Sequence, residues 1–255
     1  MHKNLIRFPV LFLLAAVLMS CSGGQPDTVP TAEGEDMVLT ATPDVSPTEP
    51  VNTDGIACDL ELPGPDDWEV VLCETFDDNR NAWEVESQDN PYAKYTSAIA
   101  DGKFVVDYSA KGFAGYQRTA LTWFTIGNEK NFALSINGLL ESSFQDASWG
   151  IAFRGNEDSY FLFSIANNGT YVFEIFENDG WIPLITPKKF NGIRLGEENT
   201  LRIEAGGQDF YFSINDEMVN QFNGGLLEGR EILLVVSAKE GVSATFTFDD
   251  VVLQR

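Results

Sequence analysis

The stretch from Gln208 to Ile214 reads QDFYFSI, and its alternation decides the fold class. Phe210, Phe212 and Ile214 fall on one face of an extended chain, and the residues between them fall on the other. A period of two, carried by aromatic and β-branched residues, is typical of a strand with one buried face. The stretch therefore predicts a β-strand, and the same pattern recurs on both sides of it.

Alternation is also found in residues 160–165 and 200–205, whereas residues 171–176 carry apolar side chains on both faces. Pairs of turn-forming residues separate such stretches, namely Asp101-Gly102, Asn168-Gly169, Asp179-Gly180, Gly206-Gly207, Asn215-Asp216 and Glu240-Gly241. No run of ten or more residues keeps a helical period. About thirteen strands at a spacing of roughly 8–12 residues predict an all-β sandwich of two antiparallel sheets, or a barrel.

Composition narrows the class of partner. The 255 residues include 39 Asp and Glu against 16 Lys and Arg, so the formal net charge is -23. The 44% hydrophobic content suffices for a full core and excludes a globally disordered chain. Phosphate binding needs clustered Lys and Arg, so we expect no nucleic-acid partner.

The single histidine of the chain, His2, lies in the N-terminal segment. A mature protein without histidine cannot use Ser-His-Asp or Cys-His catalysis, and it has no histidine to ligate a metal. Glycoside hydrolysis, which needs only two carboxylates, is the one enzyme class that remains.

Residues 1–20 predict a signal peptide. Lys3 and Arg7 precede the apolar residues 10–19, a run too short for a comfortable membrane span. Cys21 follows directly, and this junction resembles the lipobox of bacterial lipoproteins, which implies that Cys21 is lipidated and becomes the new N-terminus. The alternatives are an ordinary secretory signal with a chance cysteine, or an uncleaved anchor.

Residues 21–57 predict a disordered, acidic tether rich in Pro and Thr, because from Ser22 onward they contain no Lys, Arg or aromatic residue. Ser22 is not the Asp that resembles an inner-membrane retention signal. We therefore expect an exported protein that a lipid anchors to the bacterial membrane, at the outer membrane or the outer cell surface, with residues 58–255 as its folded domain. Cys58 and Cys73, the remaining cysteines, predict a disulfide in an exported chain, and two reduced buried thiols are the alternative.

Several short motifs occur in a recognisable order: residues 74–78 (ETFDD), Trp83, 101–104 (DGKF), 150–154 (GIAFR), 160–165 (YFLFSI), 168–171 (NGTY), Trp181, 199–203 (NTLRI), 212–216 (FSIND) and 246–251 (FTFDDV). Their order resembles the concanavalin A-like lectin and glucanase superfamily, in its laminin-G-like jelly-roll branch. The resemblance covers residues 67–255. It implies a two-sheet jelly-roll sandwich whose concave sheet often binds glycans.

In that fold the first and last strands pair, so Phe76 and Phe248 are expected side by side in the core. The aspartates that follow them, represented by Asp77 and Asp249, would then gather at one rim, where carboxylates suit a structural Ca²⁺. The alternative, which we favour, is that they are solvated turn residues and that the protein has no cofactor.

The hydrolase hypothesis fails on its motif. Laminarinase-type members carry Glu-x-Asp-x-Glu on one strand, whereas the nearest stretch here is Glu174-Ile-Phe-Glu177. An offset of three residues on a strand directs Glu174 and Glu177 to opposite faces. A degenerate or cryptic hydrolase remains the alternative, and it would need a pair of carboxylates from two different strands.

The sequence therefore predicts a non-catalytic domain that binds a neutral extracellular polysaccharide on its concave sheet. The ligand-binding candidates are Trp149, Arg154, Tyr160, Glu174 and Trp181, with Trp123, Tyr211 and Asn167 as further members. For each aromatic residue the alternative is core packing, and for Arg154 it is a salt bridge to Glu174. A purely structural module, or one that binds a surface protein, is the competing function.

Overall fold

The computed structural model of the chain describes residues 58–111, 116–125, 130–142, 145–156, 159–177, 180–224 and 227–255, with backbone alone for residues 116–125. Over these ranges every regular element is a strand, so none of them contains a helix long and apolar enough to cross a membrane. The predicted signal peptide, Cys21 and the tether lie outside the described residues.

The larger sheet has nine strands in the order β13-β12-β11-β6-β15-β4-β3-β2, and β1 pairs with β15 beside this path. Their bounds are β1 (Val70–Glu74), β2 (Ser87–Asp89), β3 (Ala93–Ala100), β4 (Lys103–Ala110), β6 (Asn131–Glu141), β11 (Asn199–Gly206), β12 (Asp209–Ile214), β13 (Glu217–Asn223) and β15 (Ser243–Gln254). Neighbouring strands run antiparallel throughout this sheet.

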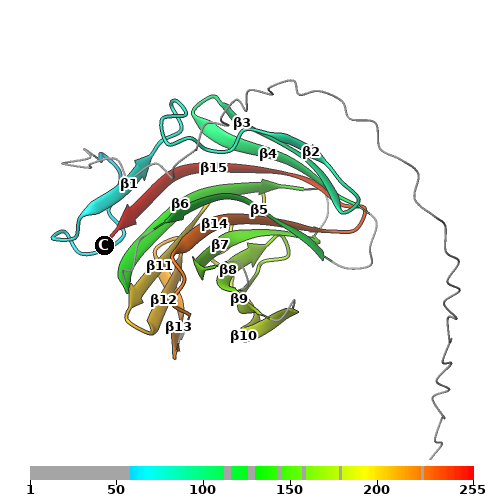
Figure 1. The fold of residues 1–255 in the computed structure, drawn as a ribbon. Helices are drawn as coiled ribbons and strands as arrows, with labels where there is room; N and C mark the ends of the chain where they lie inside the picture. Colours follow the sequence, from blue (N-terminus) through cyan, green and yellow to red (C-terminus); the bar gives the residue numbers. More distant parts are fainter. Residues whose placement is uncertain are drawn as a thin grey trace, which may run out of the picture. The chain divides into compact units, whose positions relative to one another are not determined.

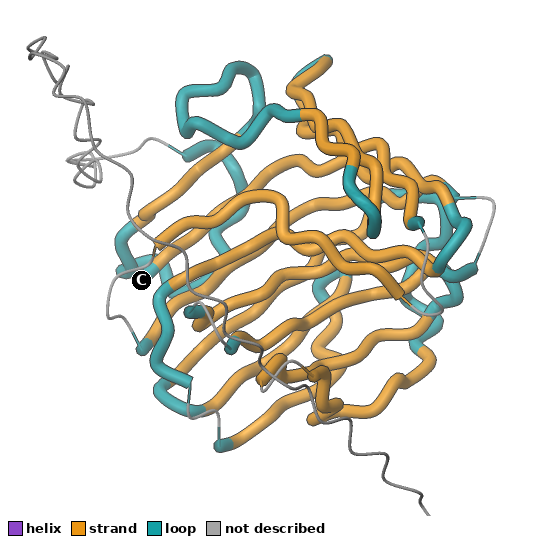
Figure 2. Tube along the Cα trace, turned by 45° about the vertical axis from the view of Figure 1, so that its right-hand side comes forward, coloured by secondary structure: helices purple, strands orange, loops and turns teal. Residues whose placement is uncertain are grey.

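The smaller sheet has six strands in the order β10-β9-β8-β7-β14-β5, all antiparallel. These are β5 (Tyr116–Thr125), β7 (Ala147–Gly155), β8 (Tyr160–Ala166), β9 (Thr170–Glu177), β10 (Gly180–Lys189) and β14 (Glu231–Lys239). In Figure 1 the strands bend as an arch, with β3, β4 and β15 along its outside and β14, β7 and β8 inside it. Figure 2 shows that turns gather mainly at the strand ends. The prediction of an all-β, two-sheet antiparallel jelly-roll sandwich is confirmed.

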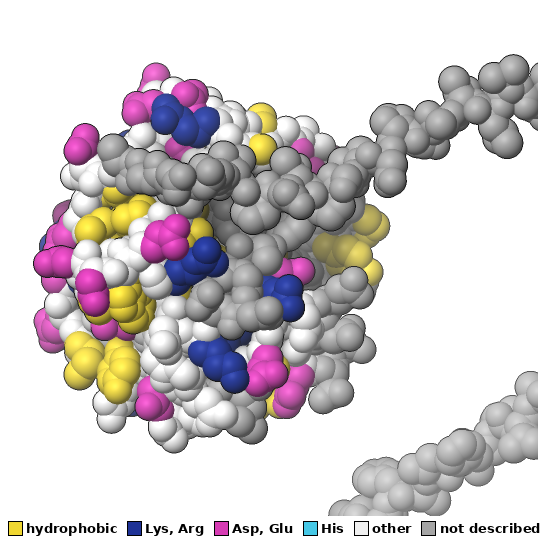
Figure 3. Space-filling model, turned by 60° about the vertical axis from the view of Figure 1, so that its left-hand side comes forward, with side chains coloured by type: hydrophobic (Ala, Val, Ile, Leu, Met, Phe, Trp, Pro, Cys, Tyr) yellow, Lys and Arg dark blue, Asp and Glu magenta, His cyan; other side chains and the backbone are white. Residues whose placement is uncertain are grey.

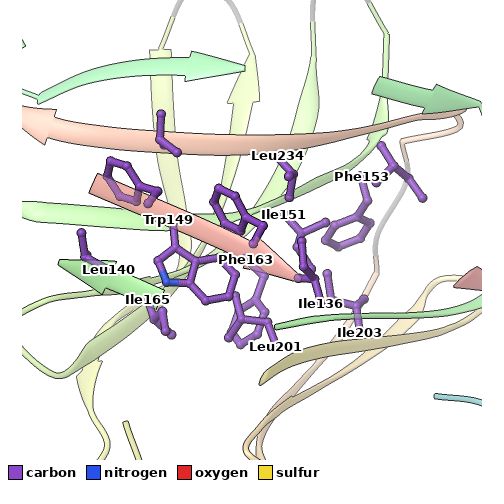
Figure 4. Close-up of a cluster of buried hydrophobic side chains, with 14 of the residues drawn as sticks. Ile136, Leu140, Trp149, Ile151, Phe153, Phe163, Ile165, Leu201, Ile203 and Leu234 are labelled. Carbon is purple, nitrogen blue, oxygen red and sulfur yellow. The ribbon is translucent and has the colours of Figure 1, made fainter. Parts of the chain in front are cut away.

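The core lies between the two sheets and is rich in aromatic rings. Phe163 and Phe173 of the smaller sheet each approach Phe212 of the larger sheet, with both ring-centroid distances at 4.6 Å. Figure 4 shows part of this core, where side chains of both sheets point toward one another. Full burial of one large apolar side chain contributes roughly 1.5–3 kcal/mol to the free energy of folding. The apolar residues that alternate along the strands are therefore the main source of stability.

The first and last strands pair as expected, since Val70–Glu74 is hydrogen-bonded to the end of β15. Phe76 and Phe248 are both fully buried. Glu74 is 2% exposed, and its carboxylate accepts hydrogen bonds from Phe76 N at 2.7 Å and from Trp83 Nε1 at 2.8 Å. The Glu74 carboxylate thus ties the loop between Glu74 and Trp83 to the core.

The predicted disulfide is confirmed, with Cys58 and Cys73 bonded. It closes a segment that crosses the outer face of the larger sheet. Arg202 Nε donates to Pro63 O at 2.6 Å, and Gly64 N donates to Gln254 Oε1 at 2.7 Å. We call residues 58–69 the strap, because these contacts hold it against β11 and β15.

Candidate functional site

The outer face of the six-stranded sheet is formed by side chains that alternate with core residues. On β8, Phe161 and Phe163 face the core, so Tyr160, Leu162 and Ser164 face outward. The direct pairing of β8 with β7 and β9 carries this alternation across the sheet. We call this surface the smaller-sheet face.

Three aromatic rings meet at one end of the smaller-sheet face. Phe176 pairs with Tyr160 on β8 and with Trp181 on β10. The ring centroids are 5.2 Å apart for Tyr160 and Phe176, 5.1 Å for Phe176 and Trp181, and 5.4 Å for Tyr160 and Trp181. All three side chains are partly exposed. These residues are the aromatic cluster.

Glu174 lies in the next row of the same face. It pairs with Leu162 on β8 and with Pro183 on β10. The residue is only 8% exposed, which is unusual for a carboxylate on the outer face of a sheet. The structure thus brings Tyr160, Trp181 and Glu174, which the sequence singled out, onto one end of one face.

Apolar and small residues continue the smaller-sheet face beyond Glu174. Ala152, Leu162 and Val235 are buried there in a cluster of their own, against which Tyr160 and Trp181 pack. The two aromatic side chains therefore have a firm support on one side, while their other surfaces remain accessible.

Ser237 adds a polar group to this face that sequence analysis missed. The residue alternates with core residues on β14 and pairs with Ser148 on β7. It is 2% exposed, and its hydroxyl has no hydrogen-bond partner among the side chains that the structure describes. A buried polar group without a partner costs about 1–3 kcal/mol. No pattern in the sequence distinguishes this serine from others on strands.

Trp149 is wrong as a ligand-binding candidate. It is 1% exposed and faces the core, where its ring lies 5.4 Å from that of Phe248 (Figure 4). The opposing sheet makes room for it with Gly138, where an added Cβ would lie 2.5 Å from the indole. The alternative of core packing is therefore correct for this tryptophan.

Arg154 does not project from the smaller-sheet face either. It is 5% exposed, and its guanidinium donates to Lys130 O at 2.8 Å and to Gly207 O, and lies 4.7 Å from the ring centroid of Phe210. Burial lowers the pKa of this guanidinium. The strand alternation breaks here because Arg154 has φ 51° and the β7–β14 register shifts nearby.

The remaining aromatic and polar candidates lie elsewhere. Tyr211 is 40% exposed but belongs to β12, in the other sheet. Asn167 Nδ2 donates to Ser142 O at 3.1 Å. The side chain of Trp123 is outside the described residues. Phe176, by contrast, was missed, although the apolar residues on both faces of 171–176 were the signal for it.

The two carboxylates of the hydrolase hypothesis do not converge. Glu174 shares the smaller-sheet face with Phe176, and Glu177 falls one residue beyond, so it faces the opposite way. Arg154 reaches the opposing sheet, whereas Glu174 faces outward. A salt bridge between these two residues is therefore excluded by geometry.

The two aspartates considered as calcium ligands have other partners. Asp77 Oδ2 accepts a hydrogen bond from Thr75 at 2.8 Å. Asp249 forms an ion pair with Lys103 at 3.0 Å, and that contact raises the pKa of the lysine. In the described part of the chain, no group of three or more His, Cys, Asp or Glu side chains is arranged to hold a metal.

Acidic residues outnumber basic ones in this chain, with 39 Asp and Glu against 16 Lys and Arg. Figure 3 shows, on one side of the molecule, Asp and Glu side chains spread over the surface with a few Lys and Arg among them. Such a surface repels polyanions. In physiological salt this electrostatic repulsion is screened beyond a distance of about 8 Å.

No family model matches the sequence, and no curated protein matches it either. Solved structures do match in three dimensions. A laminarinase from Flavobacterium sp. UMI-01 has a TM-score of 0.52 at 11% identity, over 73% of this chain and 100% of that chain. The catalytic domain of an endo-1,3-beta-glucanase from Thermotoga petrophila RKU-1 has a TM-score of 0.50 at 10% identity, over 74% of this chain and 98% of that chain.

A carbohydrate-binding module from Bacillus subtilis matches 74% of this chain and 95% of its own, at 16% identity and a TM-score of 0.42. At these identities the comparisons concern the fold alone. The strand order, the pairing of first and last strands and the likeness to the two glucanases agree with the resemblance found in the sequence. The chain has the concanavalin A-like sandwich fold.

Proposed function

We propose that this protein is a non-catalytic carbohydrate-binding protein whose site is the smaller-sheet face around the aromatic cluster. The observation that carries the proposal is the meeting of Tyr160, Phe176 and Trp181 from three adjacent strands, with each ring partly exposed. Flat apolar rings beside a few polar groups are what the face of a sugar ring requires. Glu174, in the next row, supplies a charged acceptor for hydroxyl groups.

The charge of the protein favours a neutral ligand. With a formal net charge of -23, the chain repels an anionic polysaccharide at low ionic strength. Stacking surfaces carry no charge, so binding to a neutral glycan depends little on salt. We expect weak affinity at a single site, in the micromolar to millimolar range.

Geometry supports the non-catalytic assignment. Glycosidases place two carboxyl groups about 5–9.5 Å apart on either side of one glycosidic bond. Glu174 and Glu177 face opposite sides of β9, so this pair cannot flank one bond. The chain outside His2 has no histidine to serve as an alternative acid or base.

The proposal includes display at the cell surface. A lipid attached to Cys21 would anchor the protein to an outer membrane, and residues 21–57 would act as a tether that holds the sandwich away from the membrane. In that position the sandwich would meet extracellular polysaccharide or a surface protein. Cys21→Ala, or globomycin treatment, should stop maturation and release the protein from the membrane fraction. An unchanged distribution between fractions would remove lipid anchoring from the proposal.

Binding is tested with a glycan array followed by titration calorimetry on the full-length protein in detergent. Trp181→Ala should weaken binding of the selected neutral glycan about tenfold or more, a loss of about 1.4 kcal/mol. Tyr211→Ala, which removes an exposed ring from the other sheet, is the matched control and should bind normally. Equal affinities of wild type and Trp181→Ala would refute the site. Release of reducing sugar that Glu174→Gln abolishes would refute the non-catalytic assignment.

A further inference from the structure

The outer face of the nine-stranded sheet is hollowed over β3, β4, β15 and the end of β6. The hollow has a volume of about 530 Å³, and pockets that hold small ligands span roughly 300–1,000 Å³. Its outward-facing side chains are Lys94, Thr96, Asp107, Ser109, Glu141, Ser142, Ser243 and Thr245. All of them are polar, and five carry hydroxyl groups. We call this surface the hydroxyl hollow.

One cross-strand row of the hydroxyl hollow contains two carboxylates. Thr96 pairs with Asp107, Asp107 with Thr245, and Thr245 with Glu141. Thr245 Oγ1 donates to Asp107 Oδ1 at 2.7 Å, and this bond leaves the second carboxylate oxygen of the exposed Asp107 unused. Within the described residues, neither that oxygen nor the Glu141 carboxylate accepts a hydrogen bond. Both are open to the hydroxyl groups of a ligand.

The neighbouring row supplies donors. Ser109 pairs with Lys94 on β3 and with Ser243 on β15. The two serine hydroxyls are 2.8 Å apart and hold each other in place, and Ser142 Oγ donates to Ser243 O at 3.3 Å. Lys94 is exposed and adds an ammonium group to this row, and its charge also acts on Asp89, its cross-strand neighbour on β2.

Two other carboxylates on this outer face have cationic partners. Asp249 is paired with Lys103 at 3.0 Å, and Glu204 with Arg202 at 3.2 Å. Asp107 and Glu141 have no such partner among the described residues, and Asp107 accepts only the hydroxyl of Thr245. Hydrogen bonds to ionised groups are roughly twice as strong as those between neutral groups. These two carboxylates are therefore the strongest free acceptors that the hydroxyl hollow offers.

We propose that the hydroxyl hollow is a second binding site, for a neutral polyhydroxylated ligand such as a saccharide held by its edge. Fixed carboxylates, serine hydroxyls and one ammonium group match the alternating acceptors and donors of such a ligand. Ring stacking plays no part, because Tyr95 and Tyr108, the aromatic residues of this region, are 7% and 2% exposed. An anionic saccharide is disfavoured by the two carboxylates. This site does not depend on the aromatic cluster.

The test uses methyl NMR of threonine in the full-length protein, titrated with neutral oligosaccharides from β-glucan, mannan and galactan and with oligogalacturonate as the anionic probe. Thr245 lies in the hydroxyl hollow, and Thr247 lies two residues further along the same strand, outside it. We expect a neutral probe to shift the Thr245 methyl signal saturably and to leave Thr247 unchanged.

Two variants make the result specific. Thr245→Val keeps the branched side chain and removes the hydroxyl. Combined with Asp107→Asn it should weaken binding about tenfold, as loss of one or two hydrogen bonds predicts, and the methyl signal of Thr96 in the same hollow reports binding to this variant. Thr247→Val is the matched control and should bind as wild type. Trp181→Ala should leave the Thr245 response intact, which separates this site from the aromatic cluster.

Three results would overturn the proposal. They are the absence of a Thr245 shift with every neutral probe at millimolar concentration, an equal loss in Thr247→Val, and tighter binding of oligogalacturonate than of all neutral probes. Circular dichroism of each variant confirms that it is folded, so a loss of binding cannot be assigned to unfolding.

Discussion

The outer faces of the two sheets differ in chemistry, although both sheets cover the same core. The smaller-sheet face carries aromatic rings and a buried apolar cluster, whereas the hydroxyl hollow of the larger sheet carries serine, threonine and carboxylate groups. Both cover strands whose inner faces are equally apolar. Because the core needs only the inner face of each strand, the outer faces are free to diverge. The difference therefore leaves the core unchanged and affects only the chemistry of the two outer surfaces.

The largest expected effect compares two tryptophans of the smaller sheet. Trp149→Ala removes a fully buried indole beside Gly138 and should cost about 3–5 kcal/mol in the free energy of unfolding. Trp181→Ala removes a partly exposed ring and should cost much less. Urea denaturation of both variants measures the contrast. Similar losses would mean that the aromatic cluster is part of the core and would break the comparison between faces.

The next largest expected loss of stability concerns the strap, which packs on the larger sheet. Removing the Cys58–Cys73 disulfide, with both residues changed to Ser, should lower the free energy of unfolding by about 3 kcal/mol for a loop of this length. Denaturant titration measures it. Glycan binding at the aromatic cluster should be unchanged once the variant is folded, and a loss of that binding would contradict the independence of the two faces.

The salt dependence of glycan affinity is a smaller effect, and it tests whether the ligand stacks on the rings of the aromatic cluster. Raising the salt concentration should change the affinity of a neutral glycan for the smaller-sheet face by less than about twofold, since stacking is not screened. Calorimetric titrations at low and high ionic strength test this. A steep salt dependence would point to an ionic contact in place of stacking.

The smallest effect concerns Asp250, on the larger sheet. Burial, together with the nearby Asp249, raises the pKa of this carboxyl above its ordinary value. A raised pKa in the folded state means that folding favours the protonated form, so Asp250 lowers stability as pH rises from about 4 through the raised value. Asp250→Asn should thus raise stability at neutral pH by about 0.5 kcal/mol or less and flatten this part of the pH profile. Thermal unfolding at pH 4 and pH 7 measures it, and lower stability of the variant at pH 7 would contradict the assignment.

Sequence patterns over a few residues predicted the features that depend only on nearby residues, such as which side chains of a strand face the core. Alternation identified Phe210 and Phe212 as core residues, and both are fully buried. Tyr160, Trp181 and Glu174 were chosen by side-chain type, and the register of β8, β9 and β10 places them on one face. Alternation failed at Arg154, because a positive φ and a shifted register reverse the side-chain direction, and neither is visible in residue types.

Trp149 shows a second limit of pattern reading. Trp149 has the same phase as Ile151 and Phe153, so alternation along β7 places all three side chains on the core face, and the choice of Trp149 as a ligand-binding residue followed its aromatic type and not its phase. The space for so large a ring comes from Gly138, on a strand of the other sheet. Sequence separation hid this complementarity, since nothing near Trp149 records the size of its partner.

The sequence by itself determined the all-β class, the pairing of Cys58 with Cys73 and the acidic surface, because period, cysteine count and charge are properties of the chain. Only the tertiary structure decided which side chains share a surface. Register between strands brings Phe176 to Tyr160 and Trp181, and it places Asp107 beside Thr245 across 138 positions of sequence. Recognition surfaces arise from that register, since a sheet joins residues by hydrogen bonds between strands and not by their order in the chain.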